Sequence, residues 1–210
     1  MLDKCGFTIL GCEPWFERNR HEVRRQEGME MPTVLGHAAV PLALGLGLGN
    51  PPISRRLRLA GVVAAALPDA DVLGFWLGIS YSDALGHRGA THSLAFALLL
   101  GLVAAALARP LGAGRGTAFA FAAACAASHG LLDMLTNGGY GIALWWPFSA
   151  GRLFAPWRPI EVSPLGVRAF LGERGWRVLA SEWLYVWIPA VLLVTALQAW
   201  HRARDAAQSR

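Results

Sequence analysis

Three long stretches without Asp, Glu, Lys or Arg constrain the fold more than any other feature of the chain. They are residues 91–108, 117–132 and 183–200. A mainly apolar run of about 18 residues is long enough to cross a lipid bilayer. Inside the bilayer the backbone must satisfy its own polar groups, which a helix does within one segment. These stretches therefore predict transmembrane helices.

The overall composition agrees with a membrane protein. The chain is 54% hydrophobic and only 16% charged, whereas soluble domains contain about 25% charged residues. We expect an all-α, polytopic helical membrane protein with about five transmembrane segments and one long loop. The expected segments are residues 34–49, 56–68, 91–109, 117–135 and 183–201, and the long loop is 136–181. The apolar stretch 72–79 is interpreted as re-entrant or interfacial.

The chain divides into three parts by composition. Residues 1–31 are rich in charge and lack the apolar core of a signal peptide, so we interpret them as an N-terminal tail or a start-site extension. Residues 32–201 form the expected membrane-embedded domain, and 202–210 form a charged C-terminal tail.

The arginines predict the orientation of the helices. Alternating helices put the loops 50–58 and 109–116 and the C-terminal tail on one side, and all three carry several arginines. Cytoplasmic loops of membrane proteins are enriched in Lys and Arg. We therefore expect this side to be cytoplasmic and loop 136–181 to be non-cytoplasmic. The net charge of +5 is explained in this way, and no basic stripe indicates a nucleic-acid partner.

Seven ionisable residues are expected at the opposite, non-cytoplasmic face. Each lies near the end of a predicted segment, and alternating direction brings these ends together. They are His37, Asp69, Asp71, His87, His92, His129 and Asp133. An Asp at the centre of a membrane helix costs about 2.5–3.5 kcal/mol, and less near its ends. A cation bound by the cluster would offset this cost.

The residue types indicate which ion fits. His129 and Asp133 are four residues apart, so they share one helix face. Mixed imidazole and carboxylate ligands suit zinc, and also manganese or iron. Zinc is the favoured cofactor and manganese the alternative. The sequence leaves open which of Asp69 and Asp71 is the ligand.

Five further residues are candidates for catalysis or substrate binding. Arg88 is a candidate for stabilising negative charge in a transition state, and Glu161 for a general base or further ligand. Arg152 and Arg158 are candidates for binding a phosphate. Trp146 lies in a Trp-rich segment that indicates either a membrane anchor or a substrate contact.

The order of the motifs resembles that of a known family. The motifs are GHAAVP, PDAD, HRGATHS, SHGLLD and a WPF segment, within about residues 32–164. This order resembles the YdjM-like family of inner-membrane, predicted metal-dependent hydrolases. The resemblance implies a bacterial inner-membrane location and a hydrolase. The order of His and Asp is also similar to that of zinc-dependent phospholipase C and P1-type nucleases, although a downstream HxxxE pair is missing.

We therefore expect a membrane-bound metal-dependent hydrolase. In this hypothesis a metal-activated water attacks an ester or phosphoester of a lipid or lipid-linked substrate. The alternatives are a non-enzymatic membrane protein with a structural metal or a regulatory partner-binding role, and an ion or proton transporter. Clustering of the ionisable residues at one face favours a site over a transport path. The sequence does not predict the oligomeric state.

Overall fold

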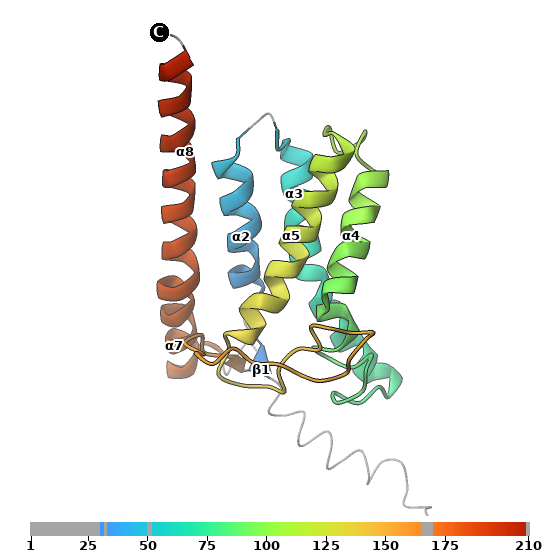
Figure 1. Cartoon of the computed structure of the whole chain (residues 1–210). Helices are drawn as coiled ribbons and strands as arrows, with labels where there is room; N and C mark the ends of the chain where they lie inside the picture. Colours follow the sequence, from blue (N-terminus) through green and yellow to red (C-terminus); the bar gives the residue numbers. More distant parts are fainter. Residues whose placement is uncertain (1–29, 32, 50–51, 165–169, 209–210) are drawn as a thin grey trace, which may run out of the picture.

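The computed structural model describes residues 30–31, 33–49, 52–164 and 170–208. Within these residues the regular secondary structure is helical except for one pair of two-residue strands (Figure 1). The principal helices are α2 (Val34–Gly47), α3 (Arg55–Ala66), α4 (Leu94–Ala106), α5 (Arg115–Met134), α7 (Glu173–Glu182) and α8 (Ile188–Gln208). Shorter elements are the 3₁₀ segments η1 (Leu67–Leu77) and η2 (Ala90–His92), the π-helical turn η3 (Trp183–Trp187), and the paired strands β1 (Glu30–Met31) and β2 (Ser163–Pro164).

Helices α2 to α5 form an antiparallel bundle, and the long α8 stands beside α2 (Figure 1). The fold class predicted from the sequence, a polytopic helical membrane protein, is confirmed. Among the described residues, three helical segments are long and apolar enough to cross a membrane, namely Arg55–Leu77, Arg115–Met134 and Glu173–Gln208. The other two predicted segments, α2 and α4, form shorter apolar helices.

Hydroxyl side chains define where the bundle helices begin. Thr33 Oγ1, Ser54 Oγ and Ser93 Oγ accept hydrogen bonds from the third residue along, at the starts of α2, α3 and α4. Such N-caps satisfy one of the free amides in the first turn. Thr33 and Ser93 also fix the helix ends closest to the predicted cluster.

Small residues let the bundle helices approach one another closely. The core between α3, α4 and α5 is formed largely by alanines together with Leu57, Phe121 and Cys125. Gly61 faces Phe121 and Cys125, and a Cβ at this position would collide with the Phe121 ring. Close packing of small residues is typical of helix interfaces in membranes.

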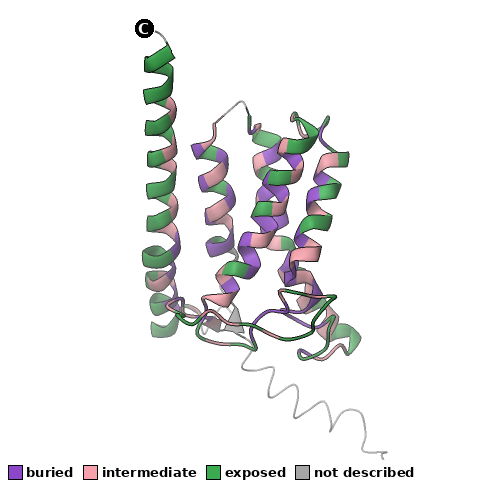
Figure 2. Cartoon of the chain, in the orientation of Figure 1, coloured by how far each residue is buried: buried purple, intermediate pink, exposed green. Residues whose placement is uncertain are grey.

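The outer surface of the bundle is apolar. Leu59, Val63, Leu98 and Leu102 are each more than half exposed, and Figure 2 shows exposed residues along the outer sides of the helices. An apolar surface of this extent is expected where helices face lipid.

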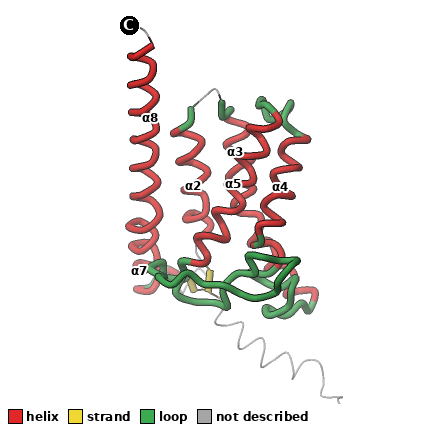
Figure 3. The backbone as a smooth tube through the Cα atoms, viewed as in Figure 1, coloured by secondary structure: helices red, strands yellow, loops and turns green. Residues whose placement is uncertain are grey.

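Loops gather at one end of the bundle and form a layer there (Figure 3). This layer contains η1, η2 and the described segments 135–164 and 170–172, and α7 begins beside it. The start of α2, the end of α5 and the start of α4 meet at the same end, whereas the arginine-rich connections lie at the other. The division into tail, membrane domain and C-terminal tail stays a prediction, and residues 1–29 lie outside the described part of the chain.

Candidate metal centre

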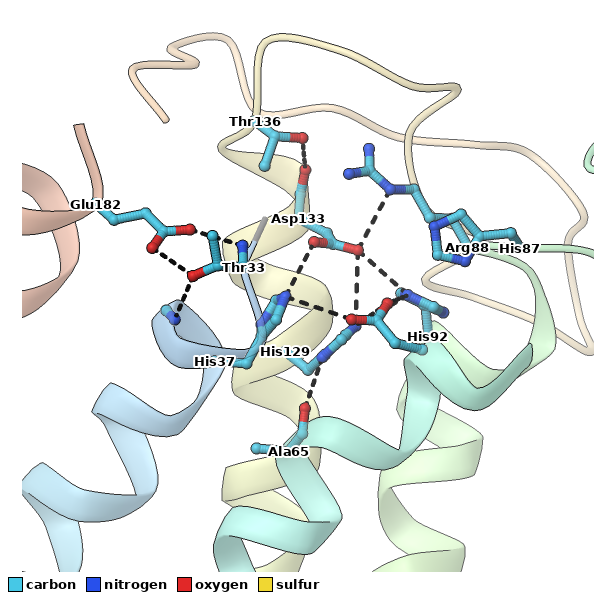
Figure 4. Close-up of polar contacts among 12 residues, drawn as sticks. Thr33, His37, Ala65, His87, Arg88, His92, His129, Asp133, Thr136 and Glu182 are labelled. Carbon is cyan, nitrogen blue, oxygen red and sulfur yellow. Dashed lines mark hydrogen bonds and ion pairs between the residues drawn. The ribbon is translucent and has the colours of Figure 1, made fainter. Parts of the chain in front are cut away.

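The loop end of the bundle holds a buried cluster of His and Asp side chains (Figure 4). All seven residues predicted as ligands lie here, contributed by α2, η1, the loop before α4, η2 and α5. His37, His87, His92, His129 and Asp133 are each at most 4% exposed. Whether they bind an ion stays a prediction, but the structure brings them together.

Four atoms form the centre of the cluster. They are Nε2 of His92, Nε2 of His129, Oδ1 of Asp69 and Oδ2 of Asp133. Five of the six distances between them run from 3.0 to 3.7 Å. Ligands at about 2.0–2.2 Å in a tetrahedral zinc site are about 3.3–3.6 Å from one another. The four atoms therefore have the spacing that one tetrahedral cation requires.

Hydrogen bonds on the far side of each ring fix how the two central histidines present their nitrogens. His129 Nδ1 lies 2.6 Å from the carbonyl oxygen of Ala65, which can only accept, so Nδ1 carries a proton. Thr91 Oγ1 donates to Asp71 Oδ2 at 2.6 Å, which leaves the hydroxyl oxygen to accept from His92 Nδ1 at 3.0 Å. In the neutral tautomers that result, both Nε2 atoms present lone pairs to the centre.

These two lone pairs lie 3.0 Å apart, with the Asp69 and Asp133 oxygens around them. Four electron-rich atoms facing one another repel unless a positive charge lies among them. Asp69 Oδ1 and both carboxylate oxygens of Asp133 are buried without a hydrogen-bond partner among the described residues. Buried carboxylates in proteins are paired or coordinate metals. The donor set therefore fits a divalent cation.

His37 adds a fifth side chain to the centre. Its ring stacks on that of His129 at 3.7 Å between centroids. Its Nε2 atom lies 3.6 Å from Asp133 Oδ1 and 4.0 Å from Asp69 Oδ2. Both ring nitrogens are buried without a hydrogen-bond partner in the described chain. His37 is therefore placed to add a nitrogen ligand.

Asp71 lies one layer further out than Asp69. Its Oδ1 accepts from His87 Nδ1 at 2.6 Å, and its Oδ2 lies 3.3 Å from His92 Nδ1. A carboxylate behind a metal-binding histidine orients the ring and raises its basicity. The structure thus separates two acids that the sequence could not tell apart, since Asp69 faces the centre and Asp71 supports His92. Asp71, His87 and His92 also form a second group with metal-ligand spacing.

Arg88 places a positive charge beside the cluster. It is fully buried, its Nε lies 3.4 Å from Asp133 Oδ2, and its Nη1 donates to the carbonyl of Gly138 at 2.8 Å. Its backbone is left-handed, with φ of 62°. A Cβ on either neighbouring glycine, Gly86 or Gly89, would collide with backbone carbonyls. The loop is therefore tightly folded, and it holds the Arg88 side chain in the protein interior.

The charged side chains of the cluster do not neutralise one another. With neutral imidazoles, the carboxylates of Asp69, Asp71 and Asp133 outweigh the Arg88 guanidinium by two negative charges. Burying uncompensated charge is costly. One divalent cation would make the cluster neutral.

Comparisons with known proteins identify the family. A family described as YdjM inner membrane protein matches residues 31–204. The inner membrane protein YbcI of Escherichia coli (strain K12) is 45% identical over 175 residues, which is 83% of this chain and 100% of that protein. The chain belongs to the YdjM family. No solved structure matches it.

Membership of the YdjM family confirms the resemblance noted in the sequence and agrees with helices that can span the inner membrane. The match runs from the start of α2 into α8 and so includes every residue of the cluster. Neither the matched family nor the relative carries an activity in its name, so a function must be argued from the site.

The other predicted site residues of this YdjM-family chain lie in the loop layer. The guanidinium of Arg152 donates to the backbone carbonyls of His87, Tyr81 and Asp83 at 2.9 to 3.1 Å. It therefore holds the loop that carries His87 in place. Burial lowers the pKa of Arg152 and raises that of Tyr81, whose hydroxyl thus stays neutral at physiological pH.

Arg158, Glu161 and Trp146 do not reach the cluster. Arg158 lies over the ring of Phe154, 4.8 Å from its centroid, and the amide of Glu161 donates to Ser181 Oγ. No hydrogen bond or ion pair joins any of the three to a cluster residue within the described segments. Their predicted roles remain predictions.

Sequence reasoning missed the buried Glu182. Its carboxylate accepts from the amide of Thr33 at 2.7 Å and from Thr33 Oγ1 at 2.6 Å, which ties the end of α7 to the start of α2 (Figure 4). A negative charge at a helix N-terminus is favourable. Because Thr33 lies one turn before His37, this contact also fixes the position of His37. A signal was present in the sequence, since Glu182 is the acid that directly precedes the last apolar run.

Proposed function

We propose that this protein is a membrane-embedded metal-dependent hydrolase that cleaves an ester or phosphoester of a lipid or lipid-linked substrate. The observation that carries the proposal is the convergence of two imidazole lone pairs and two carboxylate oxygens at distances suited to one cation. Zinc suits this mixture of nitrogen and oxygen ligands, and manganese is the alternative.

His92, His129, Asp69 and Asp133 would hold the cation, with His37 as a further ligand. When bound at such a site, a divalent cation acts as a Lewis acid and lowers the pKa of a water molecule towards neutrality. Supporting groups keep the ligands in place. Asp71 orients His92, and the carbonyl of Ala65 orients His129.

Arg88 would stabilise negative charge that develops on the substrate. Its Nη2 atom is buried and has no hydrogen-bond partner among the described residues. Fixed donors in a water-poor site stabilise a developing anion more strongly than the same groups in water. This geometry supports the predicted role of Arg88 and gives no support to Glu161 as the base, since that residue lies outside the cluster.

The expected substrate follows from where the cluster lies. It is at one end of a helix bundle whose outer surface is apolar, as expected of helices surrounded by lipid. By the bias of arginines towards the other end, this face is expected to be non-cytoplasmic. A cluster at one face favours hydrolysis over transport, because a transport path needs ionisable groups through the whole thickness of the membrane.

The proposal is tested by turnover of defined lipids. The purified protein, reconstituted in lipid nanodiscs with zinc or manganese, is offered phospholipids, and the released headgroups and acyl chains are measured by mass spectrometry. We expect product from the wild type, and none with a chelator or with the His129→Gln variant. His201→Gln is the matched control, because His201 lies near the end of α8 away from the cluster. Equal product from the wild type and His129→Gln would refute the proposal.

A further inference from the structure

Three of the four bundle helices are by themselves too short to cross a membrane. Helices α2, α3 and α4 contain 14, 12 and 13 residues. At 1.5 Å per residue they are about 21, 18 and 20 Å long. The hydrocarbon core of a bilayer is about 30 Å thick. Another part of the protein must therefore lie in the remaining ~10 Å of hydrocarbon.

The arginines determine which end makes up the difference. Arg55, Arg56, Arg109 and Arg115 are exposed at the end of the bundle opposite the cluster. An arginine deep in the hydrocarbon costs about 2.5–3.5 kcal/mol on insertion scales. Immersing four of them would cost far more than immersing apolar side chains. The membrane boundary therefore lies at the arginines, and the shortfall falls at the end that holds the cluster.

The segment η1 has the surface expected of an immersed element. Leu73, Trp76 and Leu77 are 51%, 86% and 81% exposed. The two acids of η1, Asp69 and Asp71, both point into the cluster. Only when η1 is added to α3 does the helical segment reach 23 residues and become long and apolar enough to cross a membrane. In Figure 1 the chain after α3 runs beyond the base of the bundle before it returns to α4.

We propose that η1 is inserted in the bilayer with Leu73, Trp76 and Leu77 among the lipid chains, so that the cluster opens towards lipid. Asp69 lies on this element and is 11% exposed, the most accessible of the four central residues. An ester group of a membrane lipid then reaches the centre laterally, without leaving the bilayer. That a bilayer lipid is the substrate rests on the proposed function. That η1 is inserted in the bilayer does not depend on it.

The depth of η1 is measurable without activity or metal. Leu77→Cys is labelled with an environment-sensitive fluorophore after reconstitution in vesicles, in a background in which Cys5, Cys12 and Cys125 are replaced by alanine. Ser82→Cys is the matched control, because Ser82 is exposed and follows η1 in a polar turn. Quenching is compared between nitroxide carried on lipid chains and iodide in the water.

At position 77 we expect a larger loss of fluorescence to the lipid-borne quencher than to iodide, and at position 82 the reverse. Trp76→Cys gives a second reading should Leu77→Cys fold poorly. Equal quenching by iodide at positions 76, 77 and 82 would overturn the proposal and place the site in water. The measurement is repeated in the His129→Ala variant. Insertion that persists there shows that depth and metal binding are separate properties, so either claim can fail alone.

Discussion

Asp71→Asn and Asp69→Asn should affect metal binding differently, although the two residues are neighbours on η1. Asp69 Oδ1 lies 3.5 and 3.3 Å from the Nε2 atoms of His92 and His129, at the centre of the cluster. Among the histidines, Asp71 contacts only outer nitrogens, Nδ1 of His87 and Nδ1 of His92. Asp71→Asn removes the carboxylate that supports the ligand His92, whereas Asp69→Asn removes the negative charge of a ligand itself.

The magnitudes follow from these positions. Loss of an outer partner of a metal-binding histidine costs about 10–100-fold in metal affinity. Structural zinc binds with about 10–16 kcal/mol, so an equal share for one of four ligands is about 2.5–4 kcal/mol, or roughly 70- to 1,000-fold in affinity. We therefore expect Asp71→Asn to keep one ion with weakened affinity and Asp69→Asn to lose most of the bound ion during purification.

The assay is competition with a fluorescent chelator, with the ion content determined by mass spectrometry. A wild-type content of two ions that falls to one in Asp71→Asn would refute the reasoning, because Asp71, His87 and His92 would then form a second metal site. Equal losses of affinity in the two variants would also refute it.

Three further predictions concern stability, measured by thermal unfolding in detergent. Glu182→Gln should destabilise the fold by about 1–3 kcal/mol, since Glu182 accepts two hydrogen bonds at the start of α2. The exposed Glu173→Gln, in the first turn of α7, should cost less than about 1 kcal/mol, and an equal effect of both would contradict the role of Glu182. Arg88→Gln should destabilise the metal-free protein by about 3–5 kcal/mol, because it leaves the buried carboxylate of Asp133 unpaired. Added zinc should then raise the melting temperature of this variant more than that of the wild type, and a smaller rise would contradict the charge balance of the cluster. Gly61→Ala should lower the free energy of unfolding by about 1–3 kcal/mol, because the added Cβ collides with the Phe121 ring. Gly116→Ala has open space around it and should not destabilise the fold, and the reverse order of the two effects would refute the packing.

The helices were predictable because membrane segments are marked by the absence of charge. Segments predicted at residues 56–68 and 117–135 correspond to α3 at Arg55–Ala66 and α5 at Arg115–Met134. The cost of placing a charged side chain in lipid sets the approximate limits of these segments, and it is readable from single residues. The grouping of His and Asp at one end follows from the same alternation of helices, which is why seven residues far apart in sequence were expected together.

The roles of individual side chains were not predictable in the same way. Asp69 and Asp71 are two residues apart, and which one faces the centre depends on the path of η1 after α3. Phosphate binding by Arg152 stays a prediction, whereas the three hydrogen bonds from its guanidinium to backbone carbonyls depend on how distant loops fold. The contact of Glu182 with Thr33 joins residues 149 positions apart, and no local pattern indicates a partner at that distance.

The central claim is that the cluster holds a divalent cation rather than a shared proton. Its most direct test is the metal content of the detergent-purified protein, with the His129→Ala/Asp133→Ala double variant beside the wild type. The geometry predicts one zinc or manganese ion per wild-type chain and none in the variant. A folded wild type that binds no ion, even after both metals are supplied, would contradict the account and leave a hydrogen-bonded cluster held together by protonated histidine.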